Sequence, residues 1–314
     1  MSVSVVIPLY NKRPYIERAL HSVLSQTTSP REIIVIDDGS TDGSGGEVNN
    51  FTAPNLVLVR QENRGESAAR NRGIQLARGQ TIAWLDADDT WEPDFLATIL
   101  RLQRKFPNAG AWVTAYRVVS PQGALRTPEL AVLPDGVEEG LISNYYRCGL
   151  AFPVKASAVA IPKQVLYRIG GFQEGEPKGA DVDAWLKIAL RFPLAFSRQY
   201  QATYFKNVVN SRVSARWRQE PAISRTARQA IDAGIVPPEQ VQDLKNYVSH
   251  FQVAAARDCL VQGNRQTARQ LLEYARGTQV LALKWWLYRL MAALPADAGP
   301  RLWRLKQQFK KIMP

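Results

Sequence analysis

Short apolar runs alternate with amphipathic stretches through the first hundred residues. Four of these runs are rich in β-branched residues and end at turn-forming or acidic residues, which predicts buried strands over 2–9, 32–36, 56–59 and 81–85. Between and after them, apolar residues recur at helical spacing, which predicts helices from Pro14 and over 66–78 and 93–106. Alternating strands and helices predict an α/β fold, with a mostly parallel sheet flanked by helices.

The pattern changes after Phe106. A strand is predicted over 111–119, a surface loop rich in Pro and Gly over 121–140, and a helix within 170–191. Further along, consecutive helices are predicted over 237–263, 264–277, 279–294 and 301–312. We therefore expect an α/β domain over 1–215 and a helical C-terminal region over 216–314.

Composition and charge narrow the classes of function. The chain has 314 residues, 46% of them hydrophobic and 22% charged, as in a soluble globular protein. Two cysteines and two histidines, each pair far apart in sequence, argue against a histidine-rich zinc site or a Ser–His–Asp mechanism. Any chemistry is therefore expected to depend on carboxylates. The net charge of +12 favours anionic partners, but no nucleic-acid recognition motif is present, so no nucleic acid is expected.

Targeting signals are not evident in the sequence. The apolar N-terminal run has no basic segment before it and no small-residue cleavage site. No apolar run reaches the roughly 18 residues of a membrane-spanning helix. We expect a cytoplasmic protein.

Acidic residues follow two of the predicted strands. Asp37 and Asp38 come after the second, and Asp86, Asp88 and Asp89 after the fourth. Ligands of parallel α/β sheets bind at the carboxyl ends of strands, and paired carboxylates there suit Mg²⁺ or Mn²⁺ on a diphosphate. A solvated turn is the alternative for such a run taken alone. A dinucleotide-dependent oxidoreductase would instead need a glycine-rich turn after the first strand, and a P-loop NTPase a GxxxxGK[ST] motif, and the chain has neither.

Several ordered motifs carry a resemblance to a known family. They are VIPLYN at 6–11, VIDDGSTD at 35–42, NRGESAARNRG at 63–73, LDADD at 85–89, and GGF at 170–172 followed by ADVDAWL at 180–186. Together, over about residues 2–214, they resemble family 2 glycosyltransferases. The resemblance implies a GT-A fold and an inverting, metal-dependent hexosyl transfer from a nucleotide-diphosphate sugar, UDP-linked by default. The acceptor would be a hydroxyl of a glycan or lipid-linked molecule in cell-surface polysaccharide synthesis.

The resemblance also implies a role for each matched residue. Those it places at the nucleotide sugar are Pro8, Tyr10, Asn11, Asp37, Asp38, Arg70, Asp86 and Ala87. Asp88 of the DxD motif would coordinate a Mg²⁺ or Mn²⁺ ion at the diphosphate. Asp181 would be the general base that deprotonates the acceptor hydroxyl, with Asp183 as the second candidate.

The chain departs from the family pattern at two points. Ala180 stands where the family usually has Glu before the catalytic Asp, and the segment 204–211 lacks the histidine that many members carry near the metal. These departures motivate an alternative hypothesis: a catalytically weak or inactive nucleotide-sugar-binding scaffold protein at the membrane.

The C-terminal segment is basic and amphipathic. Within 301–312, Leu302, Leu305, Phe309 and Ile312 share one helical face, opposite most of the cations. Such a helix suits an anionic membrane surface, which would make the protein peripheral at the inner face of the cell membrane. Packing of the same apolar stripe on the catalytic domain is the alternative, and the sequence leaves both open.

Overall fold

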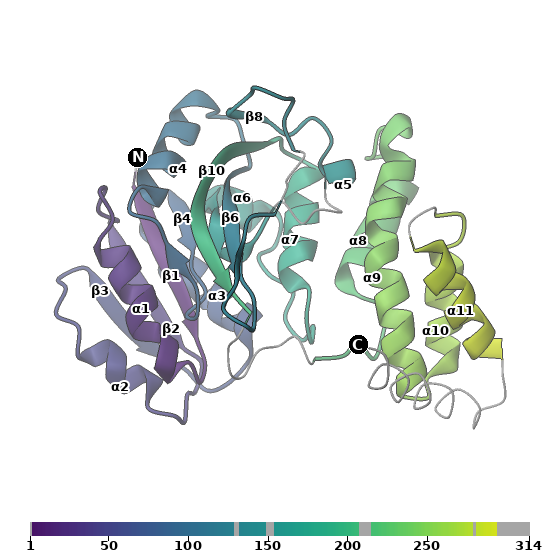
Figure 1. The fold of residues 1–314 in the computed structure, drawn as a ribbon, viewed down its shortest axis with the longest axis horizontal. Coiled ribbons are helices and arrows are strands. Elements are labelled where there is room, and N and C mark those ends of the chain that lie inside the picture. Colours follow the sequence, from purple (N-terminus) through teal and green to yellow (C-terminus); the bar gives the residue numbers. More distant parts are fainter. Residues whose placement is uncertain (1, 129–131, 149–153, 207–214, 279–280, 294–314) are drawn as a thin grey trace. The chain divides into compact units, whose positions relative to one another are not determined.

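The computed structural model describes residues 2–128, 132–148, 154–206, 215–278 and 281–293. The chain divides into two compact units (Figure 1). The first comprises Met1–Gly175 and Ala184–Ser211, and the second comprises Glu176–Asp183 and Arg212–Pro314. The domain boundary near residue 216 stays a prediction, and the assignment of 176–183 to the second unit has no signal in the sequence pattern.

The first unit is built on one ten-stranded sheet. Its strands are β1 (Val3–Leu9), β2 (Glu32–Asp37), β3 (Leu56–Arg60), β4 (Thr81–Trp84), β5 (Thr90–Trp91), β6 (Ala111–Val119), β7 (Leu125–Arg126), β8 (Glu139–Leu141), β9 (Val159–Pro162) and β10 (Leu194–Phe205). The main path runs β3-β2-β1-β4-β9-β6-β10-β5, with β7 beside β6 and β8 beside β10. The first four strands are mutually parallel, and β6 and β10 are parallel to each other.

The four parallel strands and β6 are those that the sequence predicts. Strands β1, β2 and β4 are buried almost throughout, which explains why their sequences are continuous apolar runs. The antiparallel strands β5, β7, β8 and β9 have at most four residues each, too few to show a period. Strands β7 and β8 fall within or across the end of the stretch expected to be a surface loop, 121–140, so that expectation was wrong for those residues.

Helices cover the sheet of the first unit. They are α1 (Arg13–Leu24), α2 (Ser44–Asn49), α3 (Glu66–Leu76), α4 (Phe95–Lys105), α5 (Tyr145–Cys148), the 3₁₀ turn η2 (Ala156–Ala158), α6 (Lys163–Arg168) and, beyond its first turn, α7 (Ala180–Ala189). Helix α3 packs on β1 and β2, and α4 packs on β6 and β10 (Figure 1). Helix α2 has no sequence signal, because it starts within a Gly- and Ser-rich run that favours turns.

The described part of the second unit is helical. Its elements are α8 (Ala222–Asp232), the 3₁₀ turn η4 (Pro238–Gln240), α9 (Val241–Val261), α10 (Arg265–Tyr274) and α11 (Ala282–Ala293). Helices α8, α10 and α11 all pack against α9 (Figure 1). Segment 176–183 joins this unit through Lys178, whose Nζ lies 3.0 Å from Asp258 Oδ2 of α9. The predicted helix over 301–312 lies outside the described residues. Among the helices that the structure describes, none combines the length and apolarity needed to cross a bilayer.

The contact between α3 and β1 gives a test of the packing. A Cβ at Gly73 would overlap Val6 Cγ1 and lie 3.1 Å from its Cγ2, in the interior. We expect Gly73→Ala to lower the free energy of unfolding by about 1–3 kcal/mol, because overpacking outweighs the better helix propensity of alanine. Gly46→Ala in α2 is the matched control, since its Cβ would meet nothing within 4 Å. Urea denaturation of both variants checks this, and equal stability of the two would contradict the close contact.

Candidate functional site

The acidic and polar motifs meet at one edge of the sheet. Strand β1 lies between β2 and β4 and runs parallel to both, so the three strands end at the same edge. The loops that follow them contain Asn11, the Asp37–Asp38 pair and the Asp86–Asp89 run. The structure therefore brings together the residues that the sequence predicts for nucleotide and metal binding in the first unit.

Asn11 joins the loops that follow β1 and β2. Its backbone adopts a positive φ of 51°, and its N–H donates to Ser40 Oγ at 3.0 Å. Its Oδ1 accepts from the Thr41 N–H at 2.8 Å. Tyr10 beside it is 45% exposed, while Pro8 is half-buried. Asn11 thus fixes the shape of this edge, and Tyr10 presents the open aromatic surface on it.

Asp37 closes the turn after β2. Its Oδ1 accepts from the Ser40 N–H at 2.9 Å, and its Oδ2 lies 3.6 Å from Arg60 Nε. The side chain is buried, and a Cβ at Gly45 would come within 2.5 Å of Oδ2, so α2 approaches it through a glycine. Asp37 therefore supports the turn, and its predicted contact with a nucleobase stays a prediction.

Asp38 organises the segment that leads into α3. Its Oδ1 accepts from Gln61 Nε2 at 2.8 Å and from the Arg64 N–H at 2.9 Å, and its Oδ2 accepts from the Gly65 N–H at 2.7 Å. A buried carboxylate with three such donors is well satisfied. Asp38 thus holds the start of α3 against the end of β2.

Arg70 of α3 is a buried cation at this edge. Its side chain is only 4% exposed and forms ion pairs with Glu66, one turn earlier, and with Asp86 Oδ1 at 2.8 Å. The guanidinium lies 5.3 Å from the centre of the Phe172 ring. Burial of an arginine is tolerated where carboxylates pair with it, so Arg70 and Asp86 hold each other in position.

Phe172 of the GGF motif packs beside Arg70 and is held in place by Asn71. Asn71 binds the Phe172 backbone twice, donating from Nδ2 to its O and accepting its N–H at Oδ1, both at 2.9 Å. Gly171 has a φ of +69°, and a Cβ there would lie 2.6 Å from Asn71 Oδ1. Phe172 packs edge-on against Trp84 and Trp185. Asn71 is not predicted from the sequence, although its position next to Arg70 in the third motif is a signal that could identify it.

Asp86 lies in an environment that disfavours its charge. Loss of hydration raises the pKa of this carboxyl to about 7, Arg70 opposes the shift, and the charges of Glu66 and Asp88 add to it. Its backbone N–H donates to Ser157 Oγ at 3.1 Å, and 28% of the side chain remains exposed. Near neutral pH Asp86 can therefore accept or donate a hydrogen bond to a ligand.

Asp88 forms an ion pair with a lysine of the same chain. Lys12 Nζ lies 2.6 Å from Asp88 Oδ2, and each of the two side chains is 13% exposed. Arg18 of α1 donates to the Asp88 carbonyl at 2.6 Å, and the intervening Ala87 is buried. Within the described ranges, no group of three His, Cys, Asp or Glu side chains is arranged to hold a metal ion. Lys12 and Arg18 are not predicted from the sequence, because nothing in a helix start distinguishes them from solvated cations.

Asp89 links three parts of the sheet. Its Oδ2 accepts from Ser157 Oγ at 2.6 Å, and its Oδ1 accepts from the N–H of Phe205, at the end of β10, at 3.1 Å. Burial, with the charges of Asp86 and Asp88, raises its pKa well above the ordinary value. Ser157, which binds both Asp89 and the backbone of Asp86, organises this edge and has no signal in the sequence.

The two candidates for the general base lie in the first turn of α7, in the second unit. Asp183 is 1% exposed and accepts a hydrogen bond from Thr226 Oγ1 of α8 at 2.6 Å. Asp181 is partly exposed. The environment therefore favours Asp181 over Asp183 as the residue that can meet an acceptor, and its role as a base stays a prediction.

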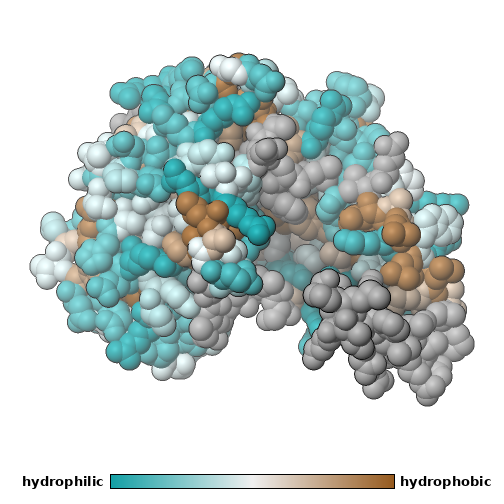
Figure 2. Space-filling model, viewed as in Figure 1, coloured by the Kyte–Doolittle hydropathy of each residue, from teal (hydrophilic) through white to brown (hydrophobic). Residues whose placement is uncertain are grey.

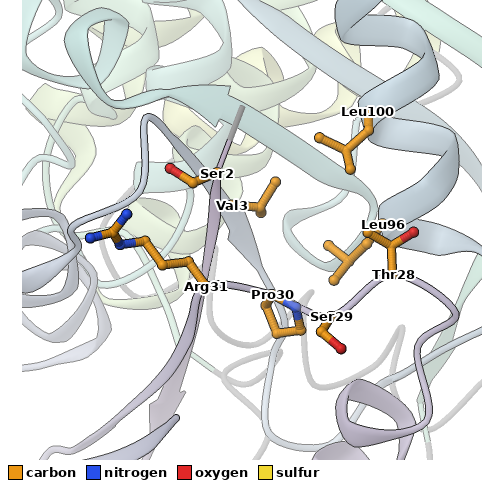
Figure 3. A pocket seen from close by; sticks show the side chains of 8 residues that line it. All are labelled: Ser2, Val3, Thr28, Ser29, Pro30, Arg31, Leu96 and Leu100. Carbon is orange, nitrogen blue, oxygen red and sulfur yellow. The ribbon is translucent and has the colours of Figure 1, made fainter.

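A pocket lies at the other end of β1 (Figure 3). Its lining comes from the start of β1, the segment before β2, and α4: Ser2, Val3, Thr28, Ser29, Pro30, Arg31, Leu96 and Leu100. Arg31 is the one charged side chain in that lining, and no carboxylate or histidine accompanies it. We therefore place the candidate site at the carboxyl edge of β1, β2 and β4.

Part of the chain matches a known protein family. Residues 4–159 match the model of glycosyl transferase family 2, a range that includes the first four motifs. A curated relative, the putative teichuronic acid biosynthesis glycosyltransferase TuaG of Bacillus subtilis, is 33% identical over 148 residues, or 45% of the chain and 58% of TuaG. The chain spans about a third to 58% of the length of the first curated relatives that it matches.

Solved structures share the fold. The crystal structure of S. aureus TarS in complex with UDP-GlcNAc has a TM-score of 0.62 at 17% identity, covering 88% of this chain and 90% of that one. The mannosyltransferase PcManGT from Pyrobaculum calidifontis, in complex with GDP-Man and Mn²⁺, has a TM-score of 0.58 at 23% identity, covering 98% and 84%. These likenesses confirm the fold class that the sequence predicts, a GT-A sheet followed by helices.

Asp89 generates a prediction about pH. Burial raises the pKa of Asp89 in the folded state above its ordinary value of 3.8. The protonated carboxyl therefore stabilises the folded state at a pH below 3.8, and this contribution is lost as the pH rises through the folded-state pKa. Asp89→Asn keeps an acceptor for the Phe205 N–H and removes the titration. We expect wild type to lose stability relative to Asp89→Asn between mildly acidic and mildly alkaline pH. Urea denaturation of both proteins at a series of pH values across this range measures the effect. A difference in the free energy of unfolding between the two proteins that does not vary with pH would contradict it.

Proposed function

Because the chain belongs to glycosyl transferase family 2, we propose that it is an inverting, metal-dependent glycosyltransferase. It moves a sugar from a nucleotide-diphosphate donor, with UDP-sugars as the first to test, to a hydroxyl of a glycan or lipid-linked acceptor in cell-surface polysaccharide synthesis. The observation that carries the proposal is the meeting of the family's first four motifs at the carboxyl edge of β1, β2 and β4. Nucleotide sugars in the structures of TarS and PcManGT support it.

The donor half of the site rests on charges at this edge. Tyr10 offers an exposed ring for stacking on a base, and Arg70 and Lys12 are cations that can exchange their carboxylate partners for a diphosphate. Asp86 has a pKa of about 7, so it can hydrogen-bond to a ribose or sugar hydroxyl in either direction. Asp37 and Asp38 keep the loops around the nucleotide in shape.

The residues present fit a Mg²⁺ or Mn²⁺ ion that is shared with the substrate. Such ions prefer hard oxygen ligands and take many of them from phosphates and water. Asp88 supplies one carboxylate at the strand end, and Mn²⁺ in the PcManGT complex supports a metal of this kind. The ion would neutralise the charge that develops on the departing diphosphate. Lys12 holds Asp88 in position and competes with a metal for its carboxylate.

Asp181 is the proposed base. It accepts the proton of the acceptor hydroxyl as that oxygen bonds to the anomeric carbon, from the face opposite the diphosphate, whose bond to the same carbon breaks. Partial exposure in the first turn of α7 supports this role, whereas Asp183 is occupied by Thr226. A carboxylate base needs no histidine, which agrees with a chain that has only two.

The proposed location is cytoplasmic, peripheral at the inner face of the cell membrane, where a lipid-linked acceptor would be found. The net charge of +12 supports attraction to an anionic surface. A scaffold protein that binds nucleotide sugars without turnover is the second candidate, and Ala180, in place of the family's Glu, is the observation that favours it.

Asp181→Asn separates the two candidates. If Asp181 is the base, we expect transfer to fall by at least about 100-fold, because the proton acceptor is lost. Donor binding should be unchanged, since Asp181 is not part of the donor half of the site. Transfer to an acceptor mixture and calorimetric binding of the donor measure the two quantities. Unchanged transfer would contradict the base assignment, and wild type that binds donor without any transfer would favour the scaffold.

Lys12→Met tests the competition at Asp88. Removing an ammonium group 2.6 Å from Asp88 Oδ2 should tighten Mn²⁺ binding in the presence of UDP by about tenfold, since repulsion between the two cations is relieved. Lys105→Met is the control, because that exposed lysine pairs with Glu139 instead. Titration of free Mn²⁺ by electron paramagnetic resonance measures affinity without turnover. Weaker Mn²⁺ binding in Lys12→Met would show that Lys12 helps to hold the ligand rather than competing with the metal.

A further inference from the structure

Helix α11 exposes more large apolar side chains than its packing accounts for. Its inner face, with Tyr288, Met291 and Ala292, is buried in the second unit, where the helix packs on α9 and α10. Four of its other side chains are exposed: Leu283 by 84%, Trp286 by 59%, Leu287 by 37% and Leu290 by 63%. They are four of the twelve exposed large apolar residues in the described part of the chain, so the exposure is concentrated on one helix. Hydrophobic residues gather around α11 in Figure 2.

The exposed side chains form one stripe. Leu283, Leu287 and Leu290 follow each other at intervals of four and three, and Trp286 fills the turn between them, so all lie on one face of the helix. At 100° per residue, Lys284 falls on one side of this stripe and Arg289 on the other. Arg289 is fixed there by Glu273 Oε2 at 2.9 Å. An apolar stripe bordered by cations is the pattern of a helix that lies in a membrane interface.

Rigid packing keeps this face turned outward within its unit. Trp285 Nε1 donates to the Leu272 carbonyl of α10 at 2.6 Å, and Arg269 of α10 donates to the Ala292 carbonyl at 2.8 Å. These bonds fix α11 near both of its ends. The stripe therefore cannot rotate inward to bury itself without breaking them.

Charge decides between a membrane and an apolar protein partner. From Asn264 to the end of the chain there are ten Lys and Arg against two acidic residues. Anionic lipid headgroups complement that balance, and the aromatic ring of Trp286 suits the boundary between headgroups and acyl chains. A second copy of the same basic helix would instead bring like charges together.

We propose that the Leu283–Leu290 face of α11 docks the protein on an anionic lipid bilayer. The inference rests on the membrane location in the proposed function and names the surface responsible for it. The four side chains would enter the interface, while Lys284 and Arg289 contact headgroups at its edges.

Vesicle sedimentation of the full chain, without donor or acceptor, tests the proposal. Wild type should bind vesicles of phosphatidylcholine with phosphatidylglycerol and bind pure phosphatidylcholine much more weakly. The variant Leu283→Gln/Trp286→Gln/Leu290→Gln should partition onto the mixed vesicles about tenfold less or weaker still, because the apolar anchors are lost. A matched control, Val57→Gln/Leu125→Gln/Ile235→Gln, removes three exposed apolar residues elsewhere and should bind like wild type.

The remaining outcomes overturn the proposal. Equal vesicle binding by the α11 variant and wild type would overturn it. Loss of binding on deletion of the residues after Pro300 would then assign the binding to the basic tail. Loss of self-association in the α11 variant, with vesicle binding unchanged, would identify a second copy as the occupant. Circular dichroism and donor binding in solution confirm that each variant is folded. Donor binding is measured without lipid. A protein that does not bind vesicles would therefore contradict the docking surface and would leave the proposed sugar transfer open to its own test.

Discussion

The first unit is organised around one constraint, the concentration of several carboxylates at one edge of its sheet. The aspartates concerned are Asp37, Asp38, Asp86, Asp88 and Asp89. Removing carboxylates from water costs several kcal/mol each unless they are paired or hydrogen-bonded. Each therefore has a partner from another element, such as Arg70 from α3, Lys12 before α1 and Ser157 before β9. Satisfying these charges ties the ends of β1, β2 and β4 to the helices and to the antiparallel strands beside them.

The same arrangement suits an anionic ligand. Lys12 and Arg70 pair with Asp88 and Asp86 in the free protein, and the function that we propose places a diphosphate beside both ion pairs. A diphosphate with a divalent ion brings its own negative and positive charges, so it can exchange partners with these pairs without leaving a charge unpaired. Because the pKa of Asp86 is raised to about 7, this carboxyl can be protonated or ionised near neutral pH while such an exchange takes place. Interactions that stabilise the free fold can thus be replaced by interactions with the donor.

The sequence predicts the strands that are continuous apolar runs. These are β1 to β4, and the motifs after them predict the edge of the sheet at which we place the candidate site. Strand β9 has four residues, and β10 is irregular, with register shifts against β6, so neither shows a pattern. Partners such as Asn71, Lys12 and Ser157 were missed because ordinary polar residues acquire these roles only through contacts distant in sequence. The burial of Asp183 depends likewise on Thr226, forty-three positions later.

Calorimetric binding of a panel of UDP-, GDP- and dTDP-sugars, with Mn²⁺, with Mg²⁺ or with EDTA, determines whether this edge of the sheet binds a nucleotide sugar. We expect wild type to bind one class of donor, EDTA to weaken this binding, and Asp88→Ala to remove the effect of the metal. Asp86 and Arg70 keep their ion pair in that variant, while Lys12 loses its carboxylate partner, so the loss of metal dependence is the readout that reports on Asp88. Failure of wild type to bind every donor under every metal condition would contradict the assignment of this edge as a nucleotide-sugar site.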